Sequence, residues 1–445
     1  MGRCDVRNIK YMQSVSAENT SRVTLGSLIM EEPCYGTSAA AIERIDEAQP
    51  KYIRITDFDD FGIEPDHKYM TAESYSEKHF LKENDILFAR TGGTVGKTFF
   101  CDGHIGNAVF AGYCIRFRFD SNKILPKFVY WYTKTEAYAN WVSGIQRPFG
   151  QPNINKEEYK LYEMIQPDKT IQKELVEMMD DAAHGRSHKL QEAKIVVEYA
   201  GKSVFAALGI TFENYAPSIF SCLSLKDIRE TGVYCNPYSA YLHYIFAMFR
   251  NNPFYVGHLE DYVDINPSIQ RSDFTDSSLV SFVSMQAVAE RVNHAEYEIC
   301  EYAKVKTGFM PFQRGDLLWA KITPFMQNGK SFLAAEMPTE FGFCSTDFYV
   351  LRSKSKKVYM PYLWILFSEE HILEAAQAML SSSAGKQRVT DSFLRKFPLI
   401  LPSLEMQKEL ADKVFLALVQ ANTLRQEAEQ GWQDAKVKFE NKLLE

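Results

Sequence analysis

The sequence lacks any long apolar run. None of its 445 residues belongs to a stretch that approaches the ~20 consecutive apolar residues needed to cross a bilayer. The opening residues 1–8 (MGRCDVRN) are too polar for a signal peptide. We therefore expect a soluble cytoplasmic protein without a membrane partner.

Cysteine and histidine are scarce and dispersed. The eight cysteines include no C-x-x-C pair, and the nine histidines show no zinc-type spacing and no arrangement typical of a nucleophile and its base. We expect reduced, mostly buried thiols, no metal site and no cofactor in this chain.

An excess of positive charge is also missing. The formal net charge is −7, which argues weakly against nucleic-acid binding by the whole surface, because contacts to phosphate require Lys and Arg. A local basic group leaves two interpretations open, a basic face or an ordinary mixed surface; its members are Arg116, Arg118, Lys123, Lys127 and Lys134.

What the sequence does contain is an internal repeat of a module near 26–175 and again near 257–410. Residues 80–90 (FLKENDILFAR) precede Gly-Lys-Thr at 96–98, and residues 312–321 (FQRGDLLWAK) precede Gly-Lys-Ser at 329–331. Residues 166–175 (QPDKTIQKEL) are matched by 401–410 (LPSLEMQKEL) at an offset of 235. Since the chain also exceeds what one core usually supports, we expect two similar domains.

The two copies share one order of expected elements. Alternation of apolar and polar residues predicts strands at 52–58, 113–119 and 281–288, and a further strand is expected at 348–351. Helices are expected at 125–142, 170–208, 238–250, 361–379 and 403–445, the second with a break near Gly185. The predicted domains span 1–165 and 253–400, the long helices lie in 166–210 and 401–445, and a linker without an assigned role spans 211–252.

The last helix carries apolar residues in a 4,3,4,3 rhythm, which is typical of a coiled-coil seam. We expect it to pair antiparallel with the helix at 170–208, although the stripe could instead complete a core. The fold class is therefore α+β, with two tandem mixed-sheet domains separated by two long antiparallel coiled-coil helices in a pseudo-two-fold repeat. The seam residues are Leu175, Leu404, Leu410, Val414, Leu418 and Trp432.

Several apparent catalytic motifs are weak. Residues 91–98 (TGGTVGKT) are similar to a phosphate-binding loop, but Thr91 replaces the first glycine, a strand is expected to follow, and the second copy lacks the glycines. Residues 252–255 (NPFY) lack the second proline of the amino-methyltransferase motif. Asp85 and Asp316 hold matching places and are expected to tie a turn before a buried strand.

Polar side chains on loops remain as candidates for binding. Arg, Lys, Gln and Asn suit base edges, while Lys and Thr suit phosphates. The Gly-Lys-Thr/Ser elements are expected to bring their lysine and hydroxyl to a polyanion. The candidate DNA-binding residues are Ser38, Arg54, Arg90, Thr94, Lys97, Arg147, Gln151 and Asn153 in the first copy, and Arg271, Gln286, Lys321, Gln327, Lys330, Lys386, Gln387 and Arg388 in the second.

Two doubled segments together carry a family resemblance. The segment 84–97 (NDILFARTGGTVGK) and the segment 401–410, each present twice, resemble those of the specificity (S) subunit of type I restriction-modification systems. The chain departs from that pattern where Asn84 replaces the usual Gly, where Gln166 replaces the usual Leu, and where the second copy lacks the Gly-Gly-Thr turn.

The resemblance implies a non-catalytic subunit with two target-recognition domains, each reading half of a split target in double-stranded DNA. Helix length would set the gap, and the helices, with the seam residues among their docking positions, would dock two methyltransferase (M) subunits. Restriction (R) translocase/endonuclease subunits would complete the complex, with adenosylmethionine, ATP and Mg on the partners. Two alternatives remain, a recognition subunit of another methylation-based phage-defence system and a nucleotide- or adenosylmethionine-dependent enzyme. The bases read and the spacer length are not predicted.

Overall fold

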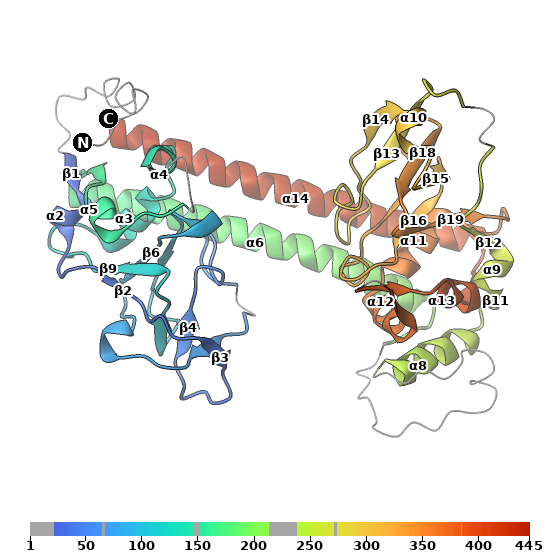
Figure 1. Cartoon of the computed structure of the whole chain (residues 1–445), viewed down its shortest axis with the longest axis horizontal. Helices are drawn as coiled ribbons and strands as arrows, with labels where there is room; N and C mark the ends of the chain where they lie inside the picture. The colour runs from blue at the N-terminus through green and yellow to red at the C-terminus, as the bar shows by residue number, and fades with distance from the viewer. Residues whose placement is uncertain (1–21, 65–66, 146–151, 213–237, 271–273, 384) are drawn as a thin grey trace. The chain divides into compact units, whose positions relative to one another are not determined.

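The computed structural model describes residues 22–64, 67–145, 152–212, 238–270, 274–383 and 385–445. The chain forms two compact units (Figure 1). The first unit contains residues up to 190 together with 425–445, and the second contains 191–424. Each unit therefore combines one globular module with part of both long helices.

The first unit is built around a four-stranded antiparallel sheet in the order β2-β9-β6-β7. Its strands are β1 (Arg22–Thr24), β2 (Cys34–Tyr35), β3 (Ala41–Glu43), β4 (Lys51–Ile53), β5 (Met70–Ala72), β6 (Ile86–Ala89), β7 (Thr98–Phe100), β8 (Ala108–Phe110), β9 (Cys114–Phe117) and β10 (Glu163–Ile165). Its helices are α2 (Leu25–Leu28), η1 (Glu77–His79), η2 (Gly92–Thr94), α3 (Pro126–Tyr132), α4 (Glu136–Ile145), α5 (Lys156–Lys160) and the first half of α6 (Lys169–Ala207).

The second unit repeats this plan with the sheet β12-β19-β16-β17 and adds a second four-stranded sheet, β14-β13-β18-β15. Its strands are β11 (Tyr255–His258), β12 (Val263–Ile265), β13 (Leu279–Val283), β14 (Glu298–Glu301), β15 (Phe309–Gln313), β16 (Leu317–Ala320), β17 (Ser331–Leu333), β18 (Phe341–Ser345), β19 (Phe348–Ser353), β20 (Leu380–Ser383), β21 (Lys386–Val389) and β22 (Pro398–Ile400). Its helices are α8 (Ser239–Arg250), α9 (Leu259–Tyr262), α10 (Tyr302–Val305), α11 (Met360–Ser368), α12 (Glu370–Ala376), η4 (Gln377–Met379), α13 (Asp391–Lys396) and the first half of α14 (Leu404–Leu444).

The internal repeat is confirmed by the pairing of the strands. The antiparallel pair β1·β10 corresponds to β11·β22, and the parallel pair β4·β8 corresponds to β13·β18. The parallel pairs join strands that are distant in sequence. In both units an inner strand of the main sheet begins directly after the repeated aspartate, β6 after Asp85 and β16 after Asp316, and we call it the central strand. The two modules are therefore copies of one topology.

Some element boundaries were predicted wrongly. The strand expected at 52–58 ends at Ile53, because Arg54 and Asp57 form a turn in which the Arg54 N–H donates to Asp57 Oδ2 at 2.9 Å. The helix expected at 125–142 breaks between α3 and α4, where the hydroxyls of Thr133 and Thr135 bond to main-chain carbonyls. The helix expected at 361–379 also divides, because Glu369 adopts an extended conformation between α11 and α12.

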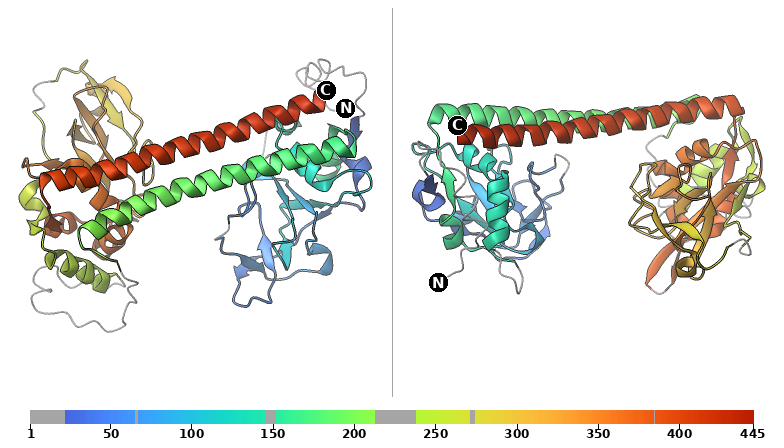
Figure 2. Two further views of the ribbon diagram at one scale, coloured as in Figure 1. Left: turned by 180° about the vertical axis from the view of Figure 1, so that it is seen from behind. Right: turned by 90° about the horizontal axis from the view of Figure 1, so that it is seen from above.

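The long helices α6 and α14 agree with the sequence prediction within three residues at each end, and α6 has no break at Gly185. Within the first unit their ends pair antiparallel (Figures 1 and 2), with Lys189 on Glu427 at 2.8 Å and Lys442 on Glu174. None of the described helices is both long and apolar enough to span a membrane.

The apolar stripe of α14 contributes to module cores as well as to the helix pair. Trp432 and Phe439 belong to the core of the first unit, with Leu175 of α6. Leu410 and Val414 belong to the core of the second unit. Leu404 and Leu418 are half-buried. The expectation that seam residues support docking therefore needs correction, since Leu175, Leu410, Val414 and Trp432 are covered by the chain itself.

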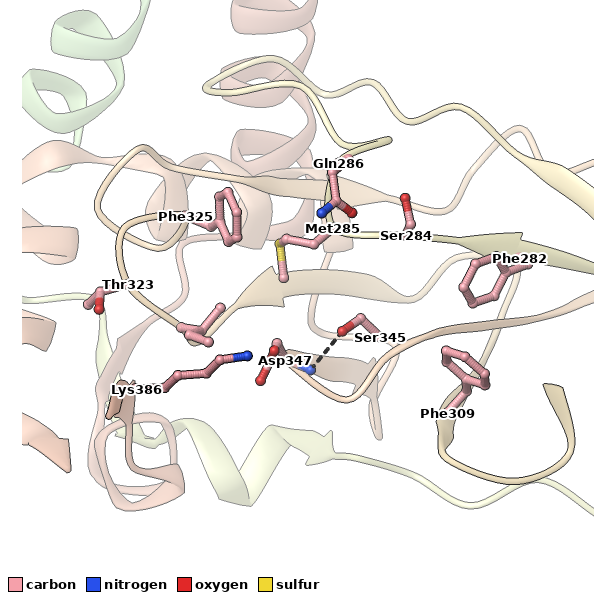
Figure 3. Close-up of a pocket in the computed structure, with 11 residues that line it drawn as sticks. Phe282, Ser284, Met285, Gln286, Phe309, Thr323, Phe325, Ser345, Asp347 and Lys386 are labelled. Atoms are coloured by element: carbon pink, nitrogen blue, oxygen red, sulfur yellow. Dashed lines mark hydrogen bonds between the residues drawn. The ribbon is translucent and has the colours of Figure 1, made fainter. Parts of the chain in front are cut away.

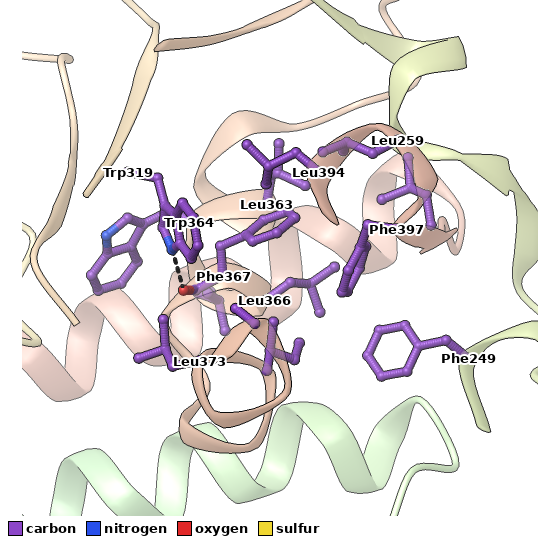
Figure 4. Packing of buried hydrophobic residues seen from close by; sticks show 14 of the residues in the cluster. Phe249, Leu259, Trp319, Leu363, Trp364, Leu366, Phe367, Leu373, Leu394 and Phe397 are labelled. Atoms are coloured by element: carbon purple, nitrogen blue, oxygen red, sulfur yellow. Dashed lines mark hydrogen bonds between the residues drawn. The ribbon is translucent and has the colours of Figure 1, made fainter. Parts of the chain in front are cut away.

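The core of the second unit lies between its main sheet and the helices α11 to α13 (Figure 4). Trp319 of β16 is fully buried there, and its indole N–H donates to the carbonyl of Phe367 at 3.1 Å. The ring of Trp319 also stacks on the ring of Phe393 in α13. This packing fixes the end of β16, and the candidate site of this unit begins directly after that strand, at Lys321.

Candidate nucleic-acid interface

A repeated turn positions the start of the central strand in each module. Asp85 and Asp316 are 1% exposed, and their Oδ2 atoms accept the main-chain N–H of the residue three positions earlier at 2.8 Å in both copies. Each carboxylate also accepts from an arginine, Arg118 Nε at 2.6 Å or Arg352 Nε at 2.8 Å. The predicted turn-tying role of the two aspartates is confirmed.

The turn also explains why Asn84 can stand where the second copy has Gly315. The backbone φ is 69° at Asn84 and 89° at Gly315, and Asn tolerates this left-handed region better than most residues. The departure from the family pattern at Asn84 therefore leaves the turn intact.

The other end of the central strand brings three loops together by the same hydrogen bonds in both units. In the first unit the Arg90 N–H donates to the Tyr113 carbonyl, and the Ile154 N–H donates to the Arg90 carbonyl, both at 2.9 Å. In the second unit the Lys321 N–H donates to the Asp347 carbonyl at 2.9 Å and the Val389 N–H donates to the Lys321 carbonyl at 2.8 Å. We define a strand-end triplet in each unit from these bonds, taking the residue just before Ile154 and Val389 as the third member. The triplets are Arg90, Tyr113 and Asn153 in the first unit and Lys321, Asp347 and Arg388 in the second.

The first triplet consists of a basic, an aromatic and an amide residue. The Arg90 guanidinium lies over the Tyr35 ring at 4.8 Å, and Asn153 is exposed. Tyr113 is 60% exposed, so its ring and hydroxyl are open to a partner. Sequence reasoning missed Tyr113, because it was assigned to a half-buried strand.

The remaining candidates of the first unit are dispersed. Arg54 is committed to Asp57 through Nε at 3.0 Å and through its NH2 group at 2.7 Å. Thr94 and Lys97 are half-exposed in the loop after β6, and Ser38 is exposed elsewhere. Arg147 and Gln151 lie outside the described residues.

In the second triplet the basic residues surround a carboxylate. Arg388 Nε donates to Asp347 Oδ1 at 2.8 Å, and the Lys321 ammonium lies over the Tyr349 ring at 4.7 Å. Burial lowers the pKa of Lys321; the Asp347 carboxylate opposes this shift, and the charge of Arg388 adds to it. Asp347, like Tyr113, was missed, because nothing in the sequence places it beside Lys321.

A pocket of about 400 Å³ opens next to this triplet (Figure 3). Two predicted candidates, Gln286 and Lys386, line it together with Asp347. Gln387 is exposed on β21 beside Lys386. The structure therefore brings Gln286, Lys321, Lys386, Gln387 and Arg388 to one region of the second unit, while Arg271 lies outside the described residues.

Two candidates of the second unit are engaged within the protein instead. Lys330 is buried, and its ammonium donates to the Met285 carbonyl at 3.2 Å and lies over the Phe325 ring. Gln327 donates through Nε2 to Gln377 Oε1 at 2.7 Å. The structure thus places the Lys330 ammonium away from the surface.

The hydroxyls of the Gly-Lys-Thr/Ser elements are also internal, so the expectation that they contact a polyanion was wrong. Thr98 and Ser331 are at most 1% exposed. Thr98 is the first residue of β7 and Ser331 is the first residue of β17, and both side chains face the interior. Thr98 Oγ1 lies 2.6 Å from Thr133 Oγ1.

The basic group near β9 and α3 does not form an open basic face. Arg116 and Arg118 are paired with Glu31, at 2.6 Å and 2.8 Å. Lys127 is paired with Asp180 at 2.8 Å, and Lys134 is buried beside Asp60. This region is an ion-paired surface.

The apparent catalytic motifs have structural roles. Residues 92–94 form a 3-10 turn followed by strand β7, whereas a phosphate-binding loop leads into a helix. Asn252 is buried, with Nδ2 donating to the Leu208 carbonyl at 2.8 Å and Oδ1 accepting from the Phe254 N–H at 2.9 Å. Among the described residues, no three His, Cys, Asp or Glu side chains come together as a metal site.

A matched pair of glutamines ties each long helix to its module. The two residues belong to the repeated segments 166–175 and 401–410, but the sequence did not predict a function for them. Gln172 Oε1 accepts the Leu125 N–H at 2.9 Å, and its Nε2 donates to the Pro167 carbonyl at 2.8 Å. Gln407 makes the equivalent bonds to Tyr359 and Pro402, both at 2.9 Å. Both glutamines are 1% exposed. The repeated Pro-x₄-Gln spacing is therefore the signal of a helix anchor.

The comparison with protein families places this doubled module. The family "Type I restriction modification DNA specificity domain" matches residues 38–195 and again 252–428. The matched segments fall on the two modules and their helices. The chain belongs to this family.

Individual relatives agree with this assignment. The specificity subunits of the type I restriction enzymes EcoEI and EcoAI of Escherichia coli are 32% and 30% identical over 145 and 148 residues. These segments cover 32% and 33% of this chain, and the chain spans about a quarter of the length of each relative, 24% and 25%. A solved chain of a type I R-M system aligns over 95% of this chain and 96% of its own length, with a TM-score of 0.52 and 13% identity, and supports the fold.

Proposed function

We propose that this chain is the DNA-recognition subunit of a type I restriction-modification complex, in which each module reads one half of a split DNA target. The observation that carries this proposal is the pair of strand-end triplets. The same main-chain hydrogen bonds present different side chains in the two copies, namely Arg, Tyr and Asn in one and Lys, Asp and Arg in the other. Such an arrangement suits two readers of different sequences.

The chemistry of the triplets favours recognition over catalysis. Arginine and lysine bind guanine edges, asparagine binds adenine, and aspartate accepts from the cytosine amino group. Methylation and cleavage then belong to partner subunits, which carry adenosylmethionine, ATP and Mg. Because the ligand is cellular or invading DNA, we place the protein in the cytoplasm.

The two long helices supply the remaining parts of the proposal. We assign them the spacing between the half-sites and the docking of two methyltransferase subunits, with restriction subunits joining the complete complex. In the second unit, Ile195 and Tyr199 of α6 and Leu416 and Val419 of α14 are between 54% and 75% exposed. Residues three or four apart share one helix face, so each helix carries an exposed apolar strip that a partner can cover.

The decisive experiment is to co-express the chain with its methyltransferase subunit and map methylated adenines across the host genome by single-molecule sequencing. A split motif with a fixed gap is the expected result. A stable complex without any motif would contradict the proposed role and favour a recognition protein of another defence system. The absence of any complex would reopen the enzyme interpretations.

Docking is tested separately with Tyr199→Ser combined with Leu416→Ser. The double variant should lose co-purification of the methyltransferase subunit while the isolated chain keeps its circular dichroism spectrum. Ile45→Ser, which changes a side chain that is 83% exposed on the first module, is the matched control and should retain the partner. Retention of the partner by the double variant would remove this strip from the docking surface.

A further inference from the structure

The pocket beside the second triplet has the composition of a site for a flat, partly polar ligand. Its volume of about 400 Å³ lies within the range typical of small-ligand sites, about 300–1,000 Å³. It lies between the loop after β13, the loop after β16 and the start of β21 (Figure 3). Five of its eleven lining residues are apolar or aromatic and six are polar or charged; the lining residues used below are Phe282, Gln286, Phe309, Phe325, Asp347 and Lys386.

Aromatic rings stand at opposite ends of the pocket. Phe282 and Phe309 pack edge to face with ring centroids 4.9 Å apart, and Phe325 lies at the far side near Gln286 (Figure 3). Aromatic rings of this kind stack against the faces of nucleobases, as they do in proteins that bind single-stranded nucleic acids. The pocket therefore offers stacking surfaces that a duplex-facing loop does not need.

The polar groups match the edge of a base. Gln286 is exposed at the rim, and its amide can both donate and accept. Asp347 accepts from Arg388 through Oδ1, and a carboxylate has further lone pairs for an amino group. The Lys386 side chain extends into the pocket towards Asp347 (Figure 3), so the carboxylate lies between two cations. Together with Lys321, these cations offset the negative charge of Asp347 near phosphates.

We propose that this pocket receives one amino-bearing base, adenine or cytosine, turned out of the DNA duplex by the second module. The inference rests on the proposed function, since it names the ligand of the same site. The Phe325 ring stacks on one face of the extruded base, and the Phe282–Phe309 pair closes the opposite end of the pocket. Asp347 and Gln286 contact its amino group and ring edge, and Lys386 and Lys321 hold the flanking backbone.

The first module offers an internal contrast. Its loop between β6 and β7 has eight residues (90–97), whereas the loop between β16 and β17 has ten (321–330) and carries Phe325. The shorter loop contains no aromatic residue, and Tyr113 stands where the second triplet has Asp347. Extrusion is therefore assigned to the second module alone.

The test uses the complete complex and a duplex carrying the mapped motif. A fluorescent adenine or cytosine analogue replaces each adenine and cytosine of both half-sites in turn, apart from the methylated adenines, which methyltransferases extrude themselves. One position in one half-site should show a several-fold rise in fluorescence on binding. An abasic site opposite that position should tighten binding roughly tenfold, because the cost of unpairing is removed.

Two variants and one control complete the test. Phe325→Ala should abolish the fluorescence rise, and Gln286→Ala, which changes an exposed side chain and so leaves folding intact, should reduce it by at least half. Lys304→Ala, at an exposed lysine of the same module, should change neither value. Sequence-specific binding without any fluorescence rise, or a rise that both variants retain, would overturn the proposal. Loss of sequence-specific binding by the unmodified complex would instead overturn the proposed function.

Discussion

The glutamine anchors give the sharpest prediction for stability. Gln407→Leu keeps the approximate size of the side chain but removes the partner of three main-chain groups, the buried carbonyl of Pro402 and the part-buried Tyr359 N–H and Lys357 carbonyl. A buried group left unsatisfied costs about 1–3 kcal/mol. With about 2 kcal/mol for the buried carbonyl and about 0.5 kcal/mol for each of the two part-buried groups, the second unit should lose about 3 kcal/mol of stability.

Hydrogen exchange followed by mass spectrometry can measure this loss where it occurs. Protection of the amides around Tyr359 and the start of α14 should fall about 100-fold, because each 1.4 kcal/mol is a factor of ten. Amides of the first unit should keep their protection. The matched variant Gln172→Leu should produce the reverse pattern, with loss around Leu125 and the start of α6.

Gln420→Leu is the control, since it makes the same chemical change at an exposed position of α14. It should alter neither unit by more than about 0.5 kcal/mol. Equal losses of protection in both units for Gln407→Leu, or a loss under about 1 kcal/mol, would refute the claim that this side chain anchors one helix to one module.

Three further predictions concern charged groups. Asp316→Ala should destabilise the second unit by about 3–5 kcal/mol in urea unfolding, because it leaves the Arg352 guanidinium without its buried partner. Burial lowers the pKa of Lys134 to about 8, below the unfolded value of about 10.4. The stability of the first unit should therefore rise between these two pH values, because the folded lysine loses its proton first. The Lys134→Met variant should not show this rise when unfolding is measured as a function of pH. Lys97→Ala should weaken DNA binding and lower the slope of log affinity against log salt by about one in fluorescence anisotropy, with equal effects on different sequences, whereas an unchanged slope would exclude a phosphate contact.

The repeat made most of the fold predictable. Constant offsets between matching segments identified two modules. The absence of proline identified α6 and α14, together with composition for α6 and an apolar rhythm for α14. These signals are local or periodic, so one sequence carries them. Asp85 and Asp316 were also assigned correctly, because they hold matching places in the two copies and no second carboxylate is paired with them in the sequence.

The candidate site was less predictable, because it depends on which loops meet. Lys330 follows a glycine in an apparently polar loop, yet its side chain is buried. Its ammonium donates to the Met285 carbonyl and lies over the Phe325 ring. Tyr113 and Asp347 are brought to the site by main-chain pairing between strands distant in sequence. Pairings of this kind leave no pattern in the residues themselves, so a polar side chain on a loop cannot be assigned to a surface from its neighbours.

Comparison of the two modules within one chain separates positions that hold the fold from positions that can read a target. Gln172 and Gln407 have the same side chain and the same hydrogen bonds, which indicates a requirement of the fold. Arg90 and Lys321 share their main-chain bonds but differ in side chain, as do the other members of the triplets. A side chain that can change while the backbone beneath it stays fixed is free to specify a base. The triplets are therefore where exchange of residues between the modules should alter the sequence recognised, while exchange at the glutamines cannot.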